Sequence, residues 1–161
     1  MRSEGEVNRA VEKYADTVRR ICIVNLKNNA DTEDIFQTVF LKYVLSSVSF
    51  ENEEHEKAWF IRVTVNACKD LLKNFFRSHT VSIDEIMEKP SSLPEDHRDV
   101  LEAVLNLPSK YRDAVYLYYY EEYTVPEISR ILDKKENTVY TLLKRSRKIL
   151  KEKLGGDEYE A

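Results

Sequence analysis

Apolar side chains recur every three or four residues along most of the chain, which is the spacing of one face of an α-helix. The pattern predicts a first helix that begins near Val7 and fades in the polar stretch 27–31. A second helix is expected at about 31–44, and a third from about Glu56 to Arg77. Alternation with a period of two is nearly absent, and only three glycines and four prolines occur, so we expect an all-α fold.

The second half of the chain predicts another group of helices behind a separating segment. Residues 79–96 mix Ser, Pro and acidic residues with few apolar ones, as linkers do. After it, the pattern predicts a helix at about 97–106, another after Pro108 and then two more. We therefore expect two small helical domains, 1–78 and 97–154, with the linker 79–96 between them and an acidic tail at 155–161.

The last two helices have the spacing of a helix-turn-helix. Thr124 and Glu127 form a T-x-x-E capping box, and Pro126 stands in the first turn of the helix that they start. Only four residues separate Leu132, near the end of that helix, from Asn137, near the start of the next. In such motifs the second helix presents its N-terminal residues to base edges.

Residues 137–154 separate on a helical wheel into an apolar arc, broken mainly by Lys153, and a polar, cationic arc. The position of the charge alone fits either a DNA-binding helix or a solvated helix end whose cations complement the helix dipole. The capped helix in front of it favours DNA. Residues expected to face bases are Asn137, Thr138, Tyr140 and Thr141, and those expected to neutralise phosphates are Lys144, Arg145 and Lys148.

The third predicted helix carries a narrow polar stripe opposite its apolar face. Four cations, an amide and an aromatic ring share this stripe, which suits a nucleic-acid backbone with a stacking partner. A solvated face is the alternative, although such a face more often mixes both signs of charge, and a lone tryptophan more often belongs to a core. The residues of the stripe are Trp59, Arg62, Asn66, Lys69, Lys73 and Arg77.

Composition narrows the function classes. No run of about 18 apolar residues and no charged, apolar leader occurs, so we expect no membrane insertion, no secretion and a cytoplasmic location. Cys22 and Cys68 lack a metal-ligand spacing, and His55, His79 and His97 are scattered. We expect no metal, no cofactor and no enzymatic activity, since no nucleophile, base and orienting group can be assembled.

Charge is distributed unevenly around the net value of −4. Residues 103–154 carry eleven Lys and Arg against seven Asp and Glu, whereas residues 81–102 carry two against seven. Positive charge is thus concentrated where the helix-turn-helix is expected, which matters more for a nucleic-acid partner than the sum does.

The run YLYYYEEY at 116–123 holds more tyrosines than one helix face can bury. We expect Leu117 and some of these tyrosines to pack inside the second domain while the others lie at its surface. An exposed aromatic surface would suit a protein partner.

A resemblance to bacterial sigma factors begins with residues 107–150, LPSKYRDAVYLYYYEEYTVPEISRILDKKENTVYTLLKRSRKIL. This stretch resembles their C-terminal promoter-binding domain, in which the last helix reads the upstream promoter element. Residues 58–77, AWFIRVTVNACKDLLKNFFR, are similar to the sigma-factor region that recognises and melts the downstream element. By the same resemblance, the preceding loop, SSVSFENEEHE, forms part of a pocket for flipped bases of the non-template strand.

The second predicted helix completes the resemblance with a D-x-x-Q-x-x-F pattern. In sigma factors this helix docks on core RNA polymerase, and a mixed acidic, amide and apolar edge suits a protein interface. The acidic residues would alternatively, or in addition, favour a helix N-terminus. The residues assigned to polymerase binding are Glu33, Asp34, Gln37, Phe40 and Leu41.

Two modules in this order, with no domain between them, are typical of the extracytoplasmic-function (ECF) group of sigma factors. The resemblance implies core RNA polymerase, promoter DNA in duplex and melted form, and an anti-sigma factor as partners. A freestanding helix-turn-helix regulator that binds operator DNA as a dimer is the alternative, but it leaves the edge at 31–44 unexplained. A helical adaptor that binds only protein is a third possibility, and it predicts no loss of function on changing Lys144 and Lys148.

Overall fold

The computed structural model describes residues 1–26, 28–78 and 103–154. The chain divides into two compact units, Met1–Pro90 and Ser91–Ala161. All regular elements in the described ranges are helical, which confirms the all-α prediction. The predicted linker, the predicted tail and most of the helix expected at 97–106 lie outside the described residues.

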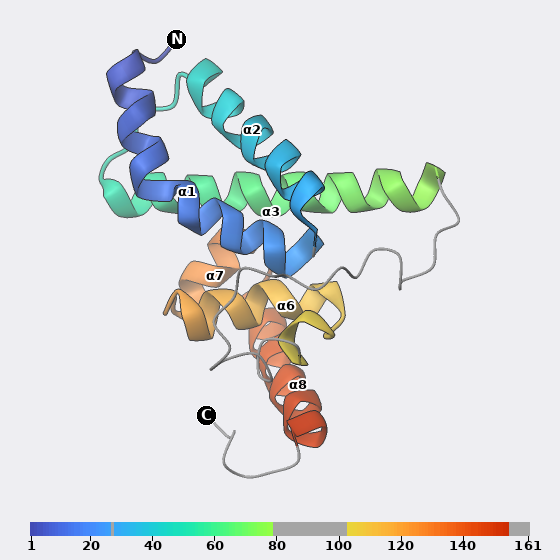
Figure 1. Cartoon of the computed structure of the whole chain (residues 1–161). Helices are drawn as coiled ribbons and strands as arrows, with labels where there is room; N and C mark the ends of the chain where they lie inside the picture. The colour runs from blue at the N-terminus through green and yellow to red at the C-terminus, as the bar shows by residue number, and fades with distance from the viewer. Residues whose placement is uncertain (27, 79–102, 155–161) are drawn as a thin grey trace. The chain divides into compact units, whose positions relative to one another are not determined.

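The first unit consists of α1 (Glu4–Leu26), α2 (Asn29–Leu45) and α3 (Glu53–Ser78). Helix α1 packs against both other helices, and the C-terminal part of α3 projects beyond them (Figure 1). Buried aromatic rings fill the centre: Phe60 lies 4.7 Å from Tyr14 and 4.9 Å from Tyr43, measured between ring centroids. This core leaves one long side of α3 to solvent.

Side-chain caps set where α2 and α3 begin. The Asn28 Oδ1 atom accepts a hydrogen bond from the Asp31 N–H at 2.8 Å, which satisfies one of the orphan donors of the first turn of α2. The Asn52 Oδ1 atom does the same for the His55 N–H at 2.8 Å. Helix α3 therefore begins at Glu53, three residues before the apolar periodicity that predicted it.

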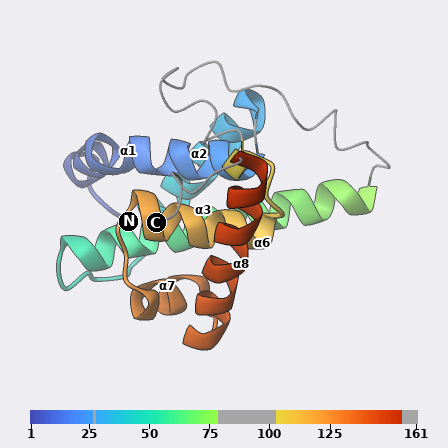
Figure 2. The same ribbon diagram turned by 90° about the horizontal axis from the view of Figure 1, so that it is seen from below.

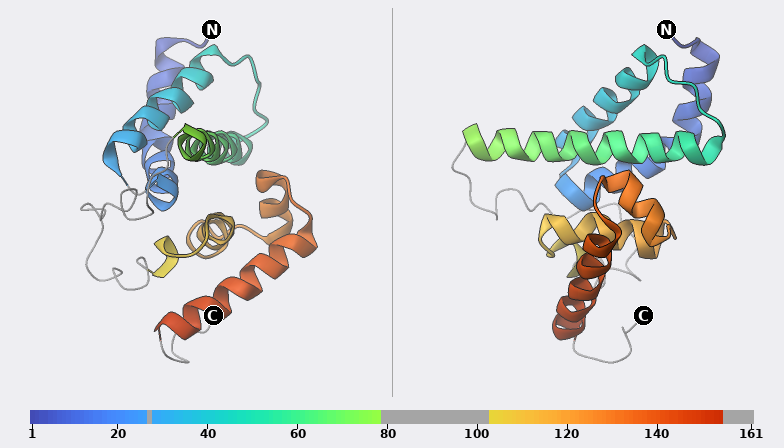
Figure 3. Two further views of the ribbon diagram at one scale, coloured as in Figure 1. Left: turned by 90° about the vertical axis from the view of Figure 1, so that its right-hand side faces the viewer. Right: turned by 180° about the vertical axis from the view of Figure 1, so that it is seen from behind.

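The second unit contains α6 (Ser109–Val115), a π-helical turn η2 (Tyr116–Tyr120), α7 (Val125–Leu132) and α8 (Glu136–Leu154). Helices α6 and α7 both pack against α8 (Figure 2). Helix α7 lies beside the N-terminal end of α8 (Figure 3). The centre of this unit includes Leu117, Ile128, Val139 and Leu143, each at most 3% exposed.

The turn between α7 and α8 confirms the helix-turn-helix. The Thr124 side chain accepts from the Glu127 N–H at 3.3 Å, and the Glu127 carboxylate accepts from the Thr124 N–H at 3.0 Å, so the capping box is complete. Asp133 ends α7 in the left-handed conformation, with φ 53°. The Lys134 N–H then donates to the Ser129 carbonyl at 3.0 Å, closing the turn as helix C-caps do.

The tyrosine run has both buried and exposed members, as expected, but a π turn that was not expected separates them. Tyr116 and Leu117 are buried, whereas the three tyrosines at 118–120 are exposed. The backbone widens into a π turn here, and the Glu121 N–H donates to the Tyr116 carbonyl five residues back, at 3.2 Å. This wider turn changes which side chains face inward.

Candidate functional site

The polar stripe of α3 is exposed from Arg62 to Lys73. Arg62, Asn66, Lys69 and Lys73 all face solvent from the side opposite the core. At 1.5 Å per residue the stripe spans about 16 Å from Arg62 to Lys73, which is about the axial rise of five nucleotides in one strand of B-DNA. Arg77 lies within α3, but its side chain is outside the described part of the structure.

Trp59 is half-buried beside this stripe. Its ring packs edge-on against Tyr43 and Phe50, with centroid distances of 5.9 Å to each. Phe60 approaches it in the same manner at 5.0 Å. Part of the indole therefore supports the fold, and only its remaining edge is available to a ligand.

The loop that precedes α3, residues 46–52, is fixed against these rings. The Phe50 ring stacks parallel to Tyr43 at 6.4 Å and meets the edge of His55 at 5.3 Å. The Glu51 N–H donates to His55 Nδ1 at 3.2 Å. Residues 47–49 remain exposed, so the loop presents its tip to solvent.

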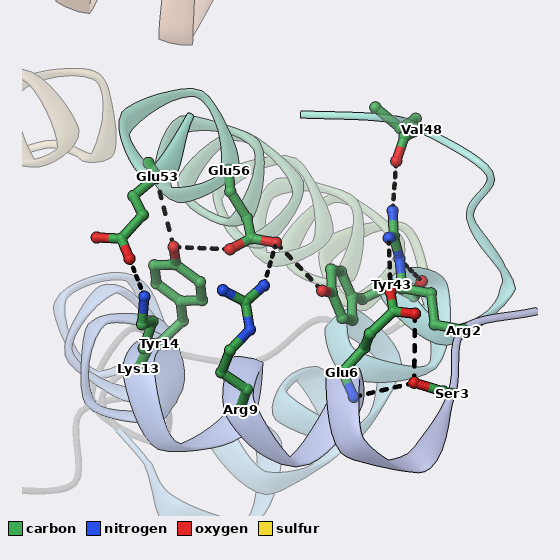
Figure 4. Close-up of polar contacts among 10 residues, drawn as sticks. All are labelled: Arg2, Ser3, Glu6, Arg9, Lys13, Tyr14, Tyr43, Val48, Glu53 and Glu56. Atoms are coloured by element: carbon green, nitrogen blue, oxygen red, sulfur yellow. Dashed lines mark hydrogen bonds and ion pairs between the residues drawn. The ribbon is translucent and has the colours of Figure 1, made fainter. Parts of the chain in front are cut away.

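A buried carboxylate joins the start of α3 to the other two helices (Figure 4). The Tyr14 hydroxyl donates to Glu56 Oε1 at 2.9 Å, and the Tyr43 hydroxyl donates to Glu56 Oε2 at 3.1 Å. Arg9 adds an ion pair at 3.6 Å. The pKa of Tyr14 is raised, mainly by burial and secondly by its hydrogen bond to Glu56. The pKa of Tyr43 is also raised, mainly by burial and secondly by the negative charge of Glu56.

Sequence reasoning missed Glu56, because the run EEHE reads as solvated acid. A usable signal was present: Glu56 lies one helical turn before Phe60, so both point to the same face. Only 4% of Glu56 is exposed. The hydroxyls of Tyr14 and Tyr43 hold the first turn of α3, and thereby the stripe, in a fixed orientation, whereas Arg9 adds opposite charge from a side chain that is 51% exposed.

The edge of α2 assigned to polymerase binding is exposed at Glu33, Asp34 and Gln37, and Leu41 is 59% exposed. Glu33 also pairs with Arg19 of α1, with 3.5 Å between Oε1 and Nε. Phe40 departs from the expectation. It is only 7% exposed and its ring packs against Phe36 and Phe60, so it supports this edge from inside and cannot reach a partner.

Helix α8 presents the predicted polar face to solvent. Its buried positions are Val139, Leu142, Leu143 and Ser146. Thr141 donates its hydroxyl to the Asn137 carbonyl at 3.0 Å, so its oxygen is left to accept from a ligand. Tyr140 is 58% exposed. The predicted DNA-facing residues are all exposed: Asn137, Thr138, Tyr140, Thr141, Lys144, Arg145 and Lys148.

The described residues offer neither a metal centre nor a membrane span. Across 1–26, 28–78 and 103–154, nowhere do three or more His, Cys, Asp or Glu side chains gather as metal ligands would. Every helix in these ranges is too short or too polar to cross a bilayer.

Comparison with known proteins finds matches to both units. Residues 10–75 match the family described as Sigma-70 region 2, and residues 91–150 match Sigma-70, region 4. The chain is 31% identical to the RNA polymerase sigma factor SigV of Bacillus subtilis over 135 residues, covering 82% of this chain and 81% of SigV. It is 27% identical to the ECF RNA polymerase sigma factor SigW of the same organism over 161 residues, covering 89% and 86%.

Two solved structures share the fold. One is the sigma factor RpoE in complex with the anti-sigma factor NepR from Bartonella quintana, with a TM-score of 0.75, 19% identity and coverage of 94% of this chain and 98% of that one. The other is CnrH in complex with the cytosolic domain of CnrY, with a TM-score of 0.70, 16% identity and coverage of 96% and 91%.

Proposed function

Because this chain belongs to the ECF group of the sigma-70 family of RNA polymerase sigma factors, we propose that each of its two units grips one promoter element through an exposed cationic helix face. A sigma factor binds core RNA polymerase, directs it to specific promoters and assists their melting, without being an enzyme. The observation that carries the proposal is the pair of exposed cationic faces, one on α3 and one on α8. A freestanding dimeric regulator would not need the first unit.

The first unit acts on the downstream element. Arg62, Lys69 and Lys73 of α3 attract the DNA backbone, as does Arg77 farther along the helix, while Asn66 supplies hydrogen bonds. The loop 46–52 and the exposed edge of Trp59 form one wall of a pocket that takes a base flipped out of the non-template strand. The loop is acidic at Glu51, so base capture rests on shape and hydrogen bonding.

The second unit acts on the upstream element. The exposed side chains in the first turns of α8 reach base edges in the major groove: Asn137, Thr138, Tyr140 and Thr141. Lys144, Arg145 and Lys148 neutralise phosphates. Each grip is weak by itself. Core polymerase holds both units at one spacing, so only promoters that present both elements at that spacing engage both.

Two protein partners complete the function. The exposed edge Glu33, Asp34, Gln37 and Leu41 docks on core polymerase, with Phe40 as its buried support. An anti-sigma factor binds the chain and holds it inactive. In support, the sigma factor RpoE, which shares the fold, was solved in complex with the anti-sigma factor NepR. The protein acts in the cytoplasm, where the polymerase is.

The experiment that tests polymerase docking changes Asp34→Ala together with Gln37→Ala. We expect affinity for core polymerase to fall by about tenfold or more, as at other interface centres. DNA binding by the free chain should be unchanged. Thr38→Ala is the matched control, because Thr38 is an exposed neighbour whose hydroxyl bonds only within its own helix, to the Asp34 carbonyl at 3.0 Å. Equal affinity of the double variant and the control would contradict the assignment.

A broader experiment tests the function itself. Core polymerase and the full chain are incubated with a library of genomic fragments, and transcripts are sequenced. The proposal expects initiation at a set of promoters that share two elements at a fixed spacing, and silence without the chain. Initiation at random positions, or none, would contradict it.

A further inference from the structure

We propose that Arg2 is a positioning residue for promoter melting: its guanidinium clamps the loop 46–52 in the conformation that captures the flipped base. The inference rests on the proposed function of that loop. It adds a residue that belongs neither to the stripe of α3 nor to any motif in the sequence.

Arg2 reaches across from the start of α1 to the end of α2. The Arg2 Nε–H donates to the Tyr43 carbonyl at 3.0 Å, and the Arg2 backbone N–H donates to the Val44 carbonyl at 3.1 Å. These carbonyls belong to the last turn of α2, which lacks the usual donors four residues on, and the Tyr43 carbonyl also accepts from the Ser46 N–H at 3.2 Å. A cation is also favoured at a helix C-terminus.

The same guanidinium then holds the loop itself. Its Nη2 donates to the Val48 carbonyl at 2.5 Å, beyond the end of α2 (Figure 4). Its Cζ atom lies over both rings, 4.3 Å from the Tyr43 centroid and 5.3 Å from that of Phe50. One side chain therefore contacts the loop at Val48, within its tip, and at Phe50, just after it.

Arg2 is itself held in place. Glu6 pairs with its Nη1 at 3.6 Å, and Ser3 caps the first turn of α1 by accepting from the Glu6 N–H at 3.2 Å. Only 13% of the Arg2 side chain is exposed. A guanidinium suits this role because its planar fork serves two carbonyls and two rings at once, which the single ammonium of a lysine does not.

The loop has few other restraints at its tip. The Val48 N–H donates to the Ser46 hydroxyl at 3.1 Å, a contact within the loop. The hydrogen bond from Arg2 to the Val48 carbonyl joins the loop to α1. If the clamp is lost, the loop populates other conformations, and apparent affinity for the captured base falls in proportion to the fraction of molecules whose loop remains competent.

The test compares Arg2→Ala and Arg2→Lys with a control, Arg9→Ala. Arg9 is an arginine of the same helix that bonds Glu56 rather than the loop. Three quantities are measured for each protein, with any purification tag at the C-terminal end: amide hydrogen exchange of residues 46–52 in the free chain, affinity for core polymerase, and holoenzyme affinity for a promoter fragment with a pre-melted mismatch bubble.

For Arg2→Ala we expect faster exchange in 46–52 and about tenfold weaker binding to the bubble, because charged hydrogen bonds of this kind are among the stronger ones. Core polymerase affinity should stay within about twofold, and Arg2→Lys should be intermediate, since it keeps the charge and loses the fork. Arg9→Ala should lower stability to unfolding without changing exchange in the loop or bubble binding.

The outcomes are distinct. If Arg2→Ala shows the same amide hydrogen exchange in residues 46–52 and the same bubble affinity as the wild type, the clamp is absent. If the loop is released but bubble binding is unchanged, the clamp exists without the positioning role. If Arg9→Ala weakens bubble binding as much as Arg2→Ala does, the effect is general destabilisation. If wild-type holoenzyme does not bind the bubble at all, the proposed function fails rather than the clamp.

Discussion

Glu56 illustrates how one buried charge is made tolerable. An ionised carboxylate inside a core is costly unless its oxygens are hydrogen-bonded and its charge is paired. Here two tyrosine hydroxyls each donate to one oxygen, and Arg9 supplies the opposite charge from the surface. Each partner comes from α1 or α2, so the arrangement specifies how α3 docks.

Removing the Tyr14 hydroxyl should show that the buried Glu56 carboxylate needs its hydrogen-bond donors. We expect Tyr14→Phe to lower the free energy of unfolding of the first unit by about 1–3 kcal/mol, because Glu56 Oε1 is left buried with less hydrogen bonding. Urea unfolding followed by circular dichroism measures it. Tyr118→Phe, at a 38% exposed site, is the control. Equal midpoints for the two variants would show that the carboxylate does not need the Tyr14 hydroxyl.

The raised pKa values of Tyr14 and Tyr43 predict a loss of stability in alkali. Below the ordinary tyrosine pKa of 10.0, both groups are neutral in the folded and unfolded states, so their contribution is fully present. Above it, the unfolded chain ionises first, and stability falls as pH rises towards the folded pKa. Urea titrations between about pH 9 and 11 should show this slope. The double variant Tyr14→Phe, Tyr43→Phe should flatten it; an unchanged slope would contradict the prediction.

At the scale of elements, local signals placed some boundaries and not others. The start of α7 and the helix-turn-helix were predictable because their signals are local in the sequence. These signals are the capping box of Thr124 and Glu127 and the turn at Asp133. The start of α3 depends on Asn52, which reads equally well as a loop residue. The π turn at Tyr116–Tyr120 was not predicted, because the apolar spacing of the sequence shows no sign of the wider turn.

Helix α8 makes a quantitative prediction about salt. Lys144→Ala with Lys148→Ala should weaken DNA binding and reduce the slope of log affinity against log salt by about 1.8, because each phosphate contact contributes about 0.9. Fluorescence anisotropy with an upstream-element duplex, titrated with salt, measures it. Lys153→Ala is the control, an exposed lysine of the same helix at the position that interrupts its apolar arc. If Lys153→Ala changed the salt slope as much as the double variant does, DNA binding would depend on the net charge of the helix and not on which residues carry it.

At the scale of the molecule, the sequence was sufficient for the class of fold, for the two cationic faces and for the family. Their residues lie on single helices, where the 3.6-residue period fixes which side chains share a face. The sites that tie elements together were not predictable in this way. Arg2 acts on residues 41 to 46 positions away. Phe40 was assigned to polymerase binding through the D-x-x-Q-x-x-F pattern, although its apolar spacing also fits the inner face of that helix, where the structure buries it.

The central claim is that the two faces do different work within one holoenzyme. It is tested most directly by footprinting a single promoter with three holoenzymes: the wild type, Lys69→Ala with Lys73→Ala, and Lys144→Ala with Lys148→Ala. DNase protection reports the upstream element, and permanganate reactivity of unpaired thymines reports opening. We predict that the first variant keeps upstream protection and loses opening, while the second loses upstream protection but still binds a pre-melted template. Two variants that lose both signals to the same extent, or retain both, would contradict this division of labour.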